Sequence, residues 1–284
     1  MRDVTRKLRT TRLPLTGAKA AAPIDPLRMG MPALDSIHST ETFSPTRKGP
    51  KYQIIHTTEV DTYENSPAAQ KLRKILPGNK APSLVALTAA IKAKAKAPSD
   101  NFAGTDRKAA KLSVGTGTVK SVANVAALIA SLPSKDAMIN HKPKITIAST
   151  SGRVTEEQRN VSLSAFLYAS SRENDNDFHL IVGGDPNKTP EMYITMEVSG
   201  LPPQNLPAFK ALNAARASFK KFFGAKLPGS TYDFYHPPIP IKIEGSLFFD
   251  MTHAKGQSPG PQSLKSRMPT IWEVHPLTSI TLGP

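Results

Sequence analysis

Hydrophobic and polar residues alternate along several stretches in the second half of the chain. In residues 161–169, VSLSAFLYA, every second position from Val161 to Ala169 is apolar, and this period of two is typical of a half-buried strand. The turn SSRENDND separates it from HLIVGG, so the two stretches predict a hairpin. Residues 192–198, MYITMEV, alternate in the same way and predict a third strand.

The period changes to that of a helix after residue 204. Asn205 is a candidate N-cap and Gly224 a candidate C-terminal glycine. Between them, apolar residues recur at helical spacing: Leu206, Phe209, Leu212, Ala215, Phe219 and Phe222. Residues 241–249 and 271–282 then predict two more strands, and Gly245 predicts a bulge in the first of these.

Three strands, one helix and two more strands are the element order of a five-stranded OB-like barrel, whose helix lies between strands 3 and 4. We therefore predict a mainly β domain over residues 151–284, with an open antiparallel sheet under one helix, an α+β sandwich, as the alternative. Residues 1–50 predict a disordered basic tail, and residues 51–150 a basic low-complexity linker with short helices. Within this linker, 51–63 contains a short β-like core, whereas 67–77, 83–97 and 116–132 have helical character. The last of these helices is expected to dock on the C-terminal domain.

The charge is concentrated in the first half of the chain. The net charge is +15, and residues 1–150 hold 24 Lys and Arg against 10 Asp and Glu. A disordered basic arm attached to a neutral domain suits long-range attraction to nucleic acid, although the lysines could equally serve only to keep the segment soluble. The phosphate contacts would come from Arg2, Arg6, Lys7, Arg9, Lys92, Lys94 and Lys96.

Composition excludes chemistry that depends on cysteine and indicates where the protein is located. The chain has no cysteine, which excludes disulfides, thiolate metal sites and cysteine nucleophiles. No run of eighteen apolar residues is present, and the N-terminus lacks the apolar core of a secretory signal. The cytoplasm is therefore the default expectation for its location.

Ionisable residues lie on or beside the predicted strands, where a buried charge is costly unless it has a partner or a function. Glu273 and His275 share one face of their strand because they are two residues apart. The full candidate set is His179, Glu197, Asp250, His253, Glu273 and His275, with Asp177 beside them. Imidazoles and carboxylates together suit a divalent metal such as zinc, manganese or non-haem iron. Two alternatives stay open: a metal-free acid–base pair of Glu273 and His275, and polar groups that only satisfy strand ends.

Aromatic residues predict a second kind of site. On the strands, opposite the expected core positions, lie Phe166, Tyr168, Tyr193 and Phe248. Aromatic side chains on the strands of a barrel can stack on bases. The competing interpretation is that these residues are part of the core.

The segments RNVSLSAFLYASSRENDNDFHLIVG, MYITMEVSGLP, IEGSLFFDMTHA and WEVHPLTSI carry a family resemblance. Together they resemble a recurrent pattern of uncharacterised bacterial proteins, DxHL followed by FFDxxH and ExHP, over residues 159–280. The resemblance implies a shared OB-like domain and no established activity. Ala254 departs from the pattern, in which Gly often follows the histidine of the FFD segment.

Three functions follow as hypotheses. The first is an OB-like binding module whose basic arm attracts nucleic acid. The second is a metal-dependent hydrolase with Asp250, His253, Glu273 and His275 at its centre. The third is a structural or scaffolding protein. Distances among the ionisable side chains distinguish the second hypothesis from the others, because metal–ligand bonds of about 2 Å require the ligands to converge.

Overall fold

A single mixed sheet of eight strands organises the described part of the chain. The computed structural model describes residues 30–61, 99–188, 192–254 and 259–284. Its strands are β1 (Ile37–Phe43), β2 (Tyr52–Thr57), β3 (Val119–Ser121), β4 (Asn160–Arg172), β5 (Phe178–Gly183), β6 (Tyr193–Val198), β7 (Asp233–Phe249) and β8 (Trp272–Leu282). The α-helices in these residues are α3 (Lys108–Lys111), α4 (Val125–Ala130), α5 (Lys135–Ile139) and α6 (Phe209–Phe223), and the 3₁₀ turns are η2 (Leu34–Ser36), η3 (Thr155–Gln158), η4 (Met251–His253) and η5 (Lys265–Arg267).

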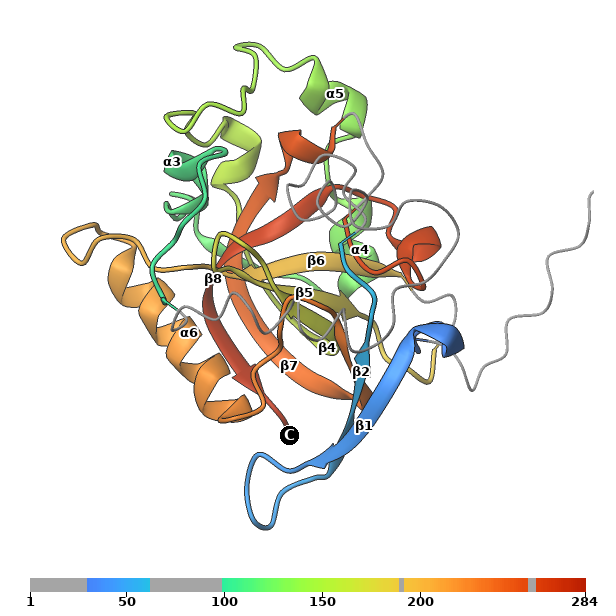
Figure 1. The fold of residues 1–284 in the computed structure, drawn as a ribbon. Helices are drawn as coiled ribbons and strands as arrows, with labels where there is room; N and C mark the ends of the chain where they lie inside the picture. The colour runs from blue at the N-terminus through green and yellow to red at the C-terminus, as the bar shows by residue number, and fades with distance from the viewer. Residues whose placement is uncertain (1–29, 62–98, 189–191, 255–258) are drawn as a thin grey trace, which may run out of the picture.

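The sheet closes on itself through five of its strands. Its order is β1-β2-β7-β8-β6-β5-β4-β3, and β4 pairs with β7 as well as with β5. This extra pairing makes a ring of β4, β5, β6, β8 and β7 (Figure 1). Most neighbours are antiparallel, but β6 pairs with β8 in parallel through only two positions, Thr195 with Glu273 and Met196 with Val274.

The prediction of a five-stranded OB-like barrel preceded by a largely disordered or helical arm is wrong. The sheet has eight strands, and the ring through five of them is not a regular barrel. The closed, mixed pairing also overturns the alternative of an open antiparallel sheet. The individual strands predicted between residues 160 and 282 are nevertheless present, and β7 is longer than expected because it begins at Asp233.

Three strands come from the segment that was expected to be an arm. β1 and β2 form a hairpin, and β2 pairs with β7 through residues 53–56. β3 pairs in parallel with the start of β4. The helix predicted over 116–132 is therefore only α4, which begins after Asn124, whose side chain accepts a hydrogen bond from the Ala127 N–H at 2.8 Å. The helices predicted over 67–77 and 83–97 lie outside the described residues.

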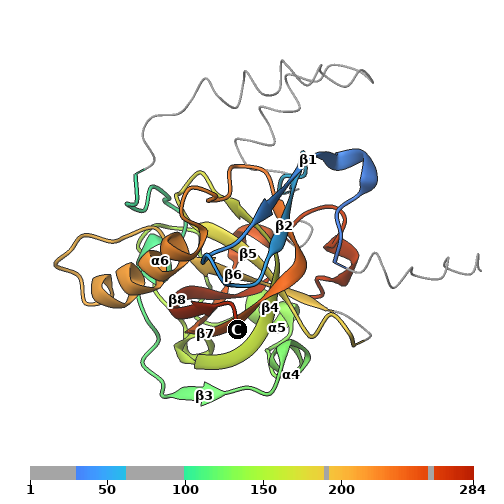
Figure 2. The same ribbon diagram turned by 90° about the horizontal axis from the view of Figure 1, so that it is seen from below.

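The main hydrophobic core fills the ring. Its members alternate along the strands, for example Leu180 and Val182 on β5 with Ile194 and Met196 on β6. α6 packs on β8 and β6 through its buried side chains, and α4 lies on a different side of the ring (Figures 1 and 2). The docking expected of the 116–132 segment is confirmed by Val125 and Leu128, both buried in this core. α6 begins at Phe209 rather than directly after Asn205, and it ends at Phe223, where Gly224 with φ +55 forms the C-cap.

Gly245 is required where β7 bends against β8. The pairing register between these two strands shifts on both sides of Gly245, which confirms the predicted bulge. A Cβ atom at this position would lie 2.6 Å from Cγ1 of Val274 and 2.7 Å from the carbonyl oxygen of Pro276. A side chain therefore cannot fit unless the strands move apart.

No helix in the described segments is long and apolar enough to cross a membrane.

His56 links three strands at the hairpin end of the sheet. Its Nδ1 lies 2.8 Å from Oδ1 of Asp233 on β7, and its Nε2 lies 3.2 Å from Oε1 of Glu41 on β1. The hydrogen bond to Asp233 raises the pKa of His56 above its ordinary value, although partial burial acts in the opposite direction. The charged imidazole therefore stabilises the attachment of the hairpin.

We expect His56→Gln to remove a pH-dependent part of the stability. Because the folded-state pKa is raised, the contribution of His56 is complete below about pH 6.5, its unfolded pKa, and disappears as the pH rises through the folded pKa. The side chain is partly exposed, so the effect should be about 1 kcal/mol or less. Urea unfolding of the variant and the parent at pH 6 and pH 9 measures it, with the exposed His236→Gln as control. An equal loss at both pH values would contradict the ion-pair explanation.

Candidate metal centre

Ionisable side chains line the face of β5, β6 and β8 that is opposite to the main core. His179 on β5 is paired with Glu197 on β6, and Glu273 on β8 is paired with Thr195 on β6. Their strand neighbours Leu180, Met196 and Val274 point into the main core, so alternation sends the polar side chains the other way. His179, Glu197, Glu273 and His275 are all buried. The sheet thus holds a row of buried charges and imidazoles.

Asp177, Glu197 and His275 form what we call the central set. One ligand atom from each lies within 4.8 Å of the others. Nε2 of His275 is 3.7 Å from Oδ2 of Asp177, and Nδ1 of His275 is 2.6 Å from Oε2 of Glu197. One imidazole gives an ion only one of its nitrogens, so these two distances place a carboxylate beside each ring nitrogen. The fit to a single cation rests on the grouping of one atom from each residue within 4.8 Å, slightly more than the separation of about 4 Å between ligands that share an ion through bonds of about 2 Å.

The backbone holds the members of the central set in place. Oδ1 of Asp177 accepts a hydrogen bond from the Gly200 N–H at 2.5 Å, which leaves Oδ2 directed at His275. The carbonyl oxygen of His275 accepts a hydrogen bond of 2.6 Å from Arg153, whose guanidinium also donates to the Leu247 carbonyl. Arg153 therefore connects β7 and β8 beside the site.

Several buried atoms in this row have no hydrogen-bond partner within the described part of the chain. They are Oδ2 of Asp177, Nε2 of His179, Oε2 of Glu197, Oε2 of Glu273, and both ring nitrogens of His275. The 2.6 Å contact between His275 and Glu197 lacks the alignment of a hydrogen bond. Three of these atoms are carboxylate oxygens, and a neutral His275 offers one further acceptor nitrogen. Buried polar atoms are nearly always paired, so this convergent group marks a candidate cation site.

The pKa shifts of the central set follow from burial with few positive charges nearby. Burial raises the pKa of Asp177 well above its ordinary value, and the neighbouring Asp175 carboxylate adds to the effect. Burial also raises the pKa of Glu197. Burial lowers the pKa of His275 to about 3, which leaves a neutral imidazole at any ordinary pH. Neutral imidazole is the form of histidine that binds metal ions.

Lys111 on α3 provides one nearby positive charge. Its Nζ is 3.3 Å from Oδ2 of Asp175 and 3.9 Å from Oδ2 of Asp177. Burial opposes its charge, yet Glu197, Asp175 and Asp177 together hold its pKa well above the ordinary lysine value. One ammonium group does not balance the carboxylates around it, and Glu273 accordingly also has a pKa raised well above its ordinary value by burial and by Glu197.

Asp250, His253 and Glu273 form the second set. Their ligand atoms also lie within 4.8 Å of one another. Oδ1 of Asp250 accepts hydrogen bonds from N–H and Oγ1 of Thr252 at 2.7 and 2.6 Å, while Oδ2 lies 3.3 Å from Nε2 of His253. Although burial acts to raise the pKa of Asp250, the His253 and Lys111 charges and the Thr252 hydrogen bonds give a lowered value. This carboxylate is therefore held ionised at the end of β7.

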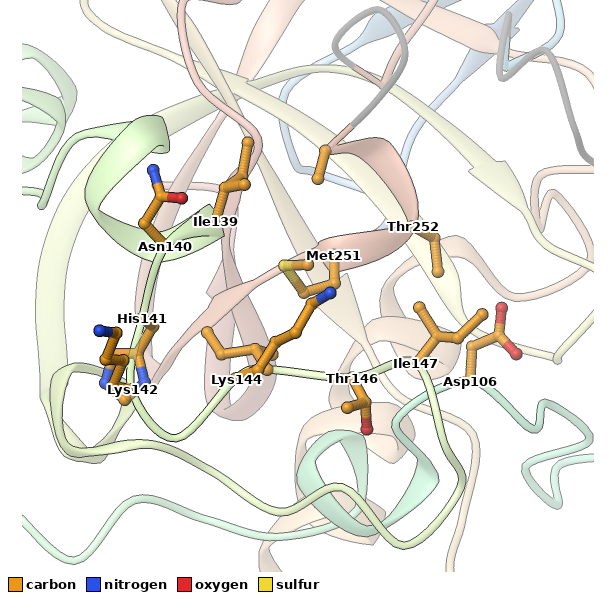
Figure 3. A pocket seen from close by; sticks show the side chains of 12 residues that line it. Asp106, Ile139, Asn140, His141, Lys142, Lys144, Thr146, Ile147, Met251 and Thr252 are labelled. Atoms are coloured by element: carbon orange, nitrogen blue, oxygen red, sulfur yellow. The ribbon is translucent and has the colours of Figure 1, made fainter.

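A pocket lies beside the second set. It has a volume of about 810 Å³ and includes Met251 and Thr252 of η4 in its lining (Figure 3). Thr252 is the residue that donates to Asp250, so a residue of the pocket lining contacts the second set directly. The rest of the lining comes mostly from the end of α5 and the loop after it, including Ile139, His141, Lys142, Lys144, Ile145 and Ile147.

Asp61, Glu173 and His179 form the third set, which contains a positive charge of its own. Nδ1 of His179 lies 3.5 Å from a carboxylate oxygen of each acid, and the Tyr232 hydroxyl is 3.3 Å from the same nitrogen. Burial opposes the charge on His179, but the Glu173 hydrogen bond and the Asp61 carboxylate raise its pKa to about 9. A protonated imidazole between two carboxylates leaves less need for a metal ion here.

The structure brings all the predicted ionisable residues to this row or to positions beside it, but it divides them among the three sets. His253 and His275, expected as ligands of one ion, belong to different sets. Sequence reasoning missed Asp61, Lys111, Glu173 and Asp175. Glu173 and Asp175 precede Asp177 and His179 at a spacing of two, which is a usable signal, whereas nothing near Lys111 or Asp61 marks them.

The predicted aromatic binding face is part of the protein interior. Tyr168, Tyr193 and Phe248 are buried, and only Phe166 is partly exposed. Tyr168 and Tyr193 pack edge to face with ring centroids 4.9 Å apart, and Phe248 lies 5.3 Å from the His275 ring and 4.8 Å beneath the Arg107 guanidinium. The rings therefore enclose the polar row.

The seven basic-arm residues lie outside the described part of the chain, and nucleic-acid binding stays a prediction.

Comparison of the chain with protein-family models, with curated proteins and with solved structures finds no match, so the function of this centre has to be inferred from its own chemistry.

Proposed function

We propose that this protein binds a divalent transition-metal ion in the central set, through Asp177, Glu197 and His275. The observation that supports this is the convergence of buried ligand atoms for which the described residues supply no hydrogen-bond partner. Leaving such groups without a partner costs about 1–3 kcal/mol each, and more for a charged group. A bound cation removes this cost for all three residues at once.

The charges and ligand types fit such an ion. Two carboxylates and a neutral imidazole carry a charge of −2 when both acids are ionised, which one divalent ion balances. A mixed set of nitrogen and oxygen ligands suits Zn²⁺ or Mn²⁺, whereas Ca²⁺ and Mg²⁺ prefer oxygen alone. Zn²⁺ and Mn²⁺ are therefore the ions to test first.

A metal-dependent hydrolase is the activity that this centre supports best. Structural zinc sites are almost always closed by four protein ligands, whereas catalytic sites use three and keep a position for water. The central set offers three. An ion bound there would lower the pKa of a bound water and polarise an ester or amide carbonyl, or a phosphoryl oxygen. Lys111, close to Asp177, lowers the pKa of that ligand against the larger effect of burial.

We expect the purified protein to hold Zn²⁺ or Mn²⁺ and to lose stability when the ion is removed. At a free metal concentration of 100 times Kd, the ion stabilises the fold by about 2.7 kcal/mol. Asp177→Asn should weaken metal binding by at least about 100-fold, since even a residue behind a ligand contributes 10- to 100-fold. Asparagine can still accept the Gly200 hydrogen bond through its own Oδ1, so the variant should fold.

The measurement is elemental analysis after dialysis, followed by thermal unfolding with EDTA and with added Zn²⁺ or Mn²⁺. Asp136→Asn, which removes an exposed acid on α5, is the matched control and should behave like the parent protein. Absence of bound metal together with unchanged unfolding in EDTA and in added metal would overturn the proposal.

A further inference from the structure

The second set repeats the composition of the central set. Asp250, His253 and Glu273 are again one imidazole and two carboxylates, all buried, with ligand atoms within 4.8 Å of one another. Glu273 is 1% exposed, and its Oε2 has no hydrogen-bond partner among the described residues. An acidic cluster alone does not define a site, but a buried carboxylate oxygen without a donor points to a ligand that is positively charged.

Glu273 also connects the two sets. Its Oε2 lies 3.8 Å from Nδ1 of His275, a member of the central set, while the same carboxylate belongs to the second set. Glu273 and His275 are two residues apart on β8 and so point to the same side of the strand. A carboxylate between two groups of ligands can bind one ion with each oxygen.

We propose that the centre is binuclear, with a second divalent ion held by Asp250, His253 and Glu273 and bridged to the first ion by Glu273. The bridge gives the first ion a fourth protein ligand, so the position for water in the binuclear centre is on the second ion, which has three. This inference rests on the proposed metal binding of the central set and adds a second ion to it. Two metal ions about 3.5–4 Å apart are a common arrangement for hydrolysis of phosphate esters and peptides, because they stabilise both the attacking and the leaving oxygen.

The position of the pocket gives the second ion a distinct role. The pocket lies on the side of Asp250, where Thr252 forms part of its lining, whereas none of the central-set residues lines it. The second ion is therefore the one nearer to an incoming substrate. Lys142 and Lys144 also line this pocket (Figure 3), so the expected substrate is anionic, with an apolar part that contacts the isoleucines.

The third set is not expected to hold an ion. His179 already lies between two carboxylates and contacts the Tyr232 hydroxyl through the nitrogen that faces them. The proposal therefore specifies two ions per chain, not three.

The test is titration of the metal-free full chain with Mn²⁺, with elemental analysis for stoichiometry and electron paramagnetic resonance for the distance between ions. We expect two Mn²⁺ per chain and the spectrum of an exchange-coupled pair. Asp250→Asn should reduce the count to one and convert the spectrum to the six lines of an isolated ion. Glu244→Gln, on β7 away from the centre, is the control and should retain the coupled pair.

The outcomes separate this inference from the metal binding on which it rests. No bound Mn²⁺ would overturn both. One Mn²⁺ per chain, lost in Asp177→Asn and kept in Asp250→Asn, would overturn the binuclear centre and leave the proposed function intact. Two ions without exchange coupling would mean that the second is elsewhere on the molecule, which would also overturn it. If Asp250→Asn fails to fold, as judged by circular dichroism, His253→Gln replaces it with the same expected result.

Discussion

Replacing Arg107 by methionine is expected to destabilise the fold by about 3–5 kcal/mol, because it leaves a buried carboxylate without its partner. The guanidinium of Arg107 pairs with both oxygens of Glu157 at 2.6 and 2.8 Å and also donates to the carbonyl oxygens of Phe249 and Gly152. Both side chains of the pair are almost fully buried. Methionine keeps much of the volume but none of these interactions.

A double variant separates the charge from the packing. In Arg107→Met/Glu157→Gln the glutamine can still accept the 2.8 Å hydrogen bond from the Phe249 N–H, but it carries no charge. This double variant should therefore be more stable than Arg107→Met alone. Urea unfolding measures all three proteins, with the exposed Lys108→Met as control. A loss below about 1 kcal/mol for Arg107→Met would contradict a buried-pair role.

The same arginine covers the proposed centre. Its guanidinium lies 4.8 Å above the Phe248 ring, which in turn packs 5.3 Å from the ring of His275. Loss of Arg107 should therefore also loosen the cover over a proposed metal ligand, and the variant should show a weaker response of its unfolding midpoint to added metal.

Phe219→Ala is expected to cost about 3–5 kcal/mol, the usual range for removing a buried aromatic ring. Phe219 is fully buried on α6, with its ring centroid 4.8 Å from those of Phe178 on β5 and Phe223 on the same helix. The ring fills the space between the helix and the sheet, where a rigid set of neighbours cannot collapse easily.

The comparison is with Ser218→Ala, the exposed neighbour on the same helix. That substitution should change the free energy of unfolding by no more than about 0.5 kcal/mol. Denaturant unfolding with unchanged slope would show that the difference reflects stability rather than a change in the unfolded state. Similar losses in the two variants would indicate that α6 does not contribute to the core in the way described.

Local patterns in the sequence predicted the elements of the second half well. Alternation over 192–198 identified a strand and its two faces, since Ile194, Met196 and Val198 do enter the core while Tyr193 and Glu197 point away. Alternation over 161–169 identified β4 and its core face only as far as Leu167. The pairing register of β4 shifts between Leu167 and Ala169, and Ala169 lies with Tyr168 in a separate cluster. The same alternation placed the ionisable side chains on the opposite face. Period-two patterns carry this information because the two faces of these strands meet different surroundings.

Pairing between distant segments could not be predicted in this way. Residues 52–57 show a β-like core, but their partner on β7 lies some 180 positions further along the chain. β3 has only three residues, and all of them are exposed, so it has no hydrophobic pattern to detect. Local periodicity therefore could not predict the eight-stranded sheet, and three of its strands lie in the segment that was predicted to be an arm.

The sequence predicted most residues of the candidate site, but not which acid lies beside which histidine. Which acid lies next to which histidine depends on the register of β6 against β8, and this register is set by only two paired positions. The aromatic residues illustrate the opposite error. Tyr168, Tyr193 and Phe248 lie off the main core as predicted, yet loops and α3 cover that face, and a sequence pattern cannot show a cover built from distant segments.

The parallel contact between β6 and β8 has a consequence for the order of folding. β8 is the last strand of the sheet in chain order, it closes the ring between β6 and β7, and it carries both Glu273 and His275. Until β8 is inserted, β6 and β7 are open sheet edges of the kind that pair with other chains. Neither proposed ion can be fully bound in such an intermediate. Metal uptake would therefore mark the moment of ring closure, and a cell short of the ion would accumulate the form that is most prone to aggregate.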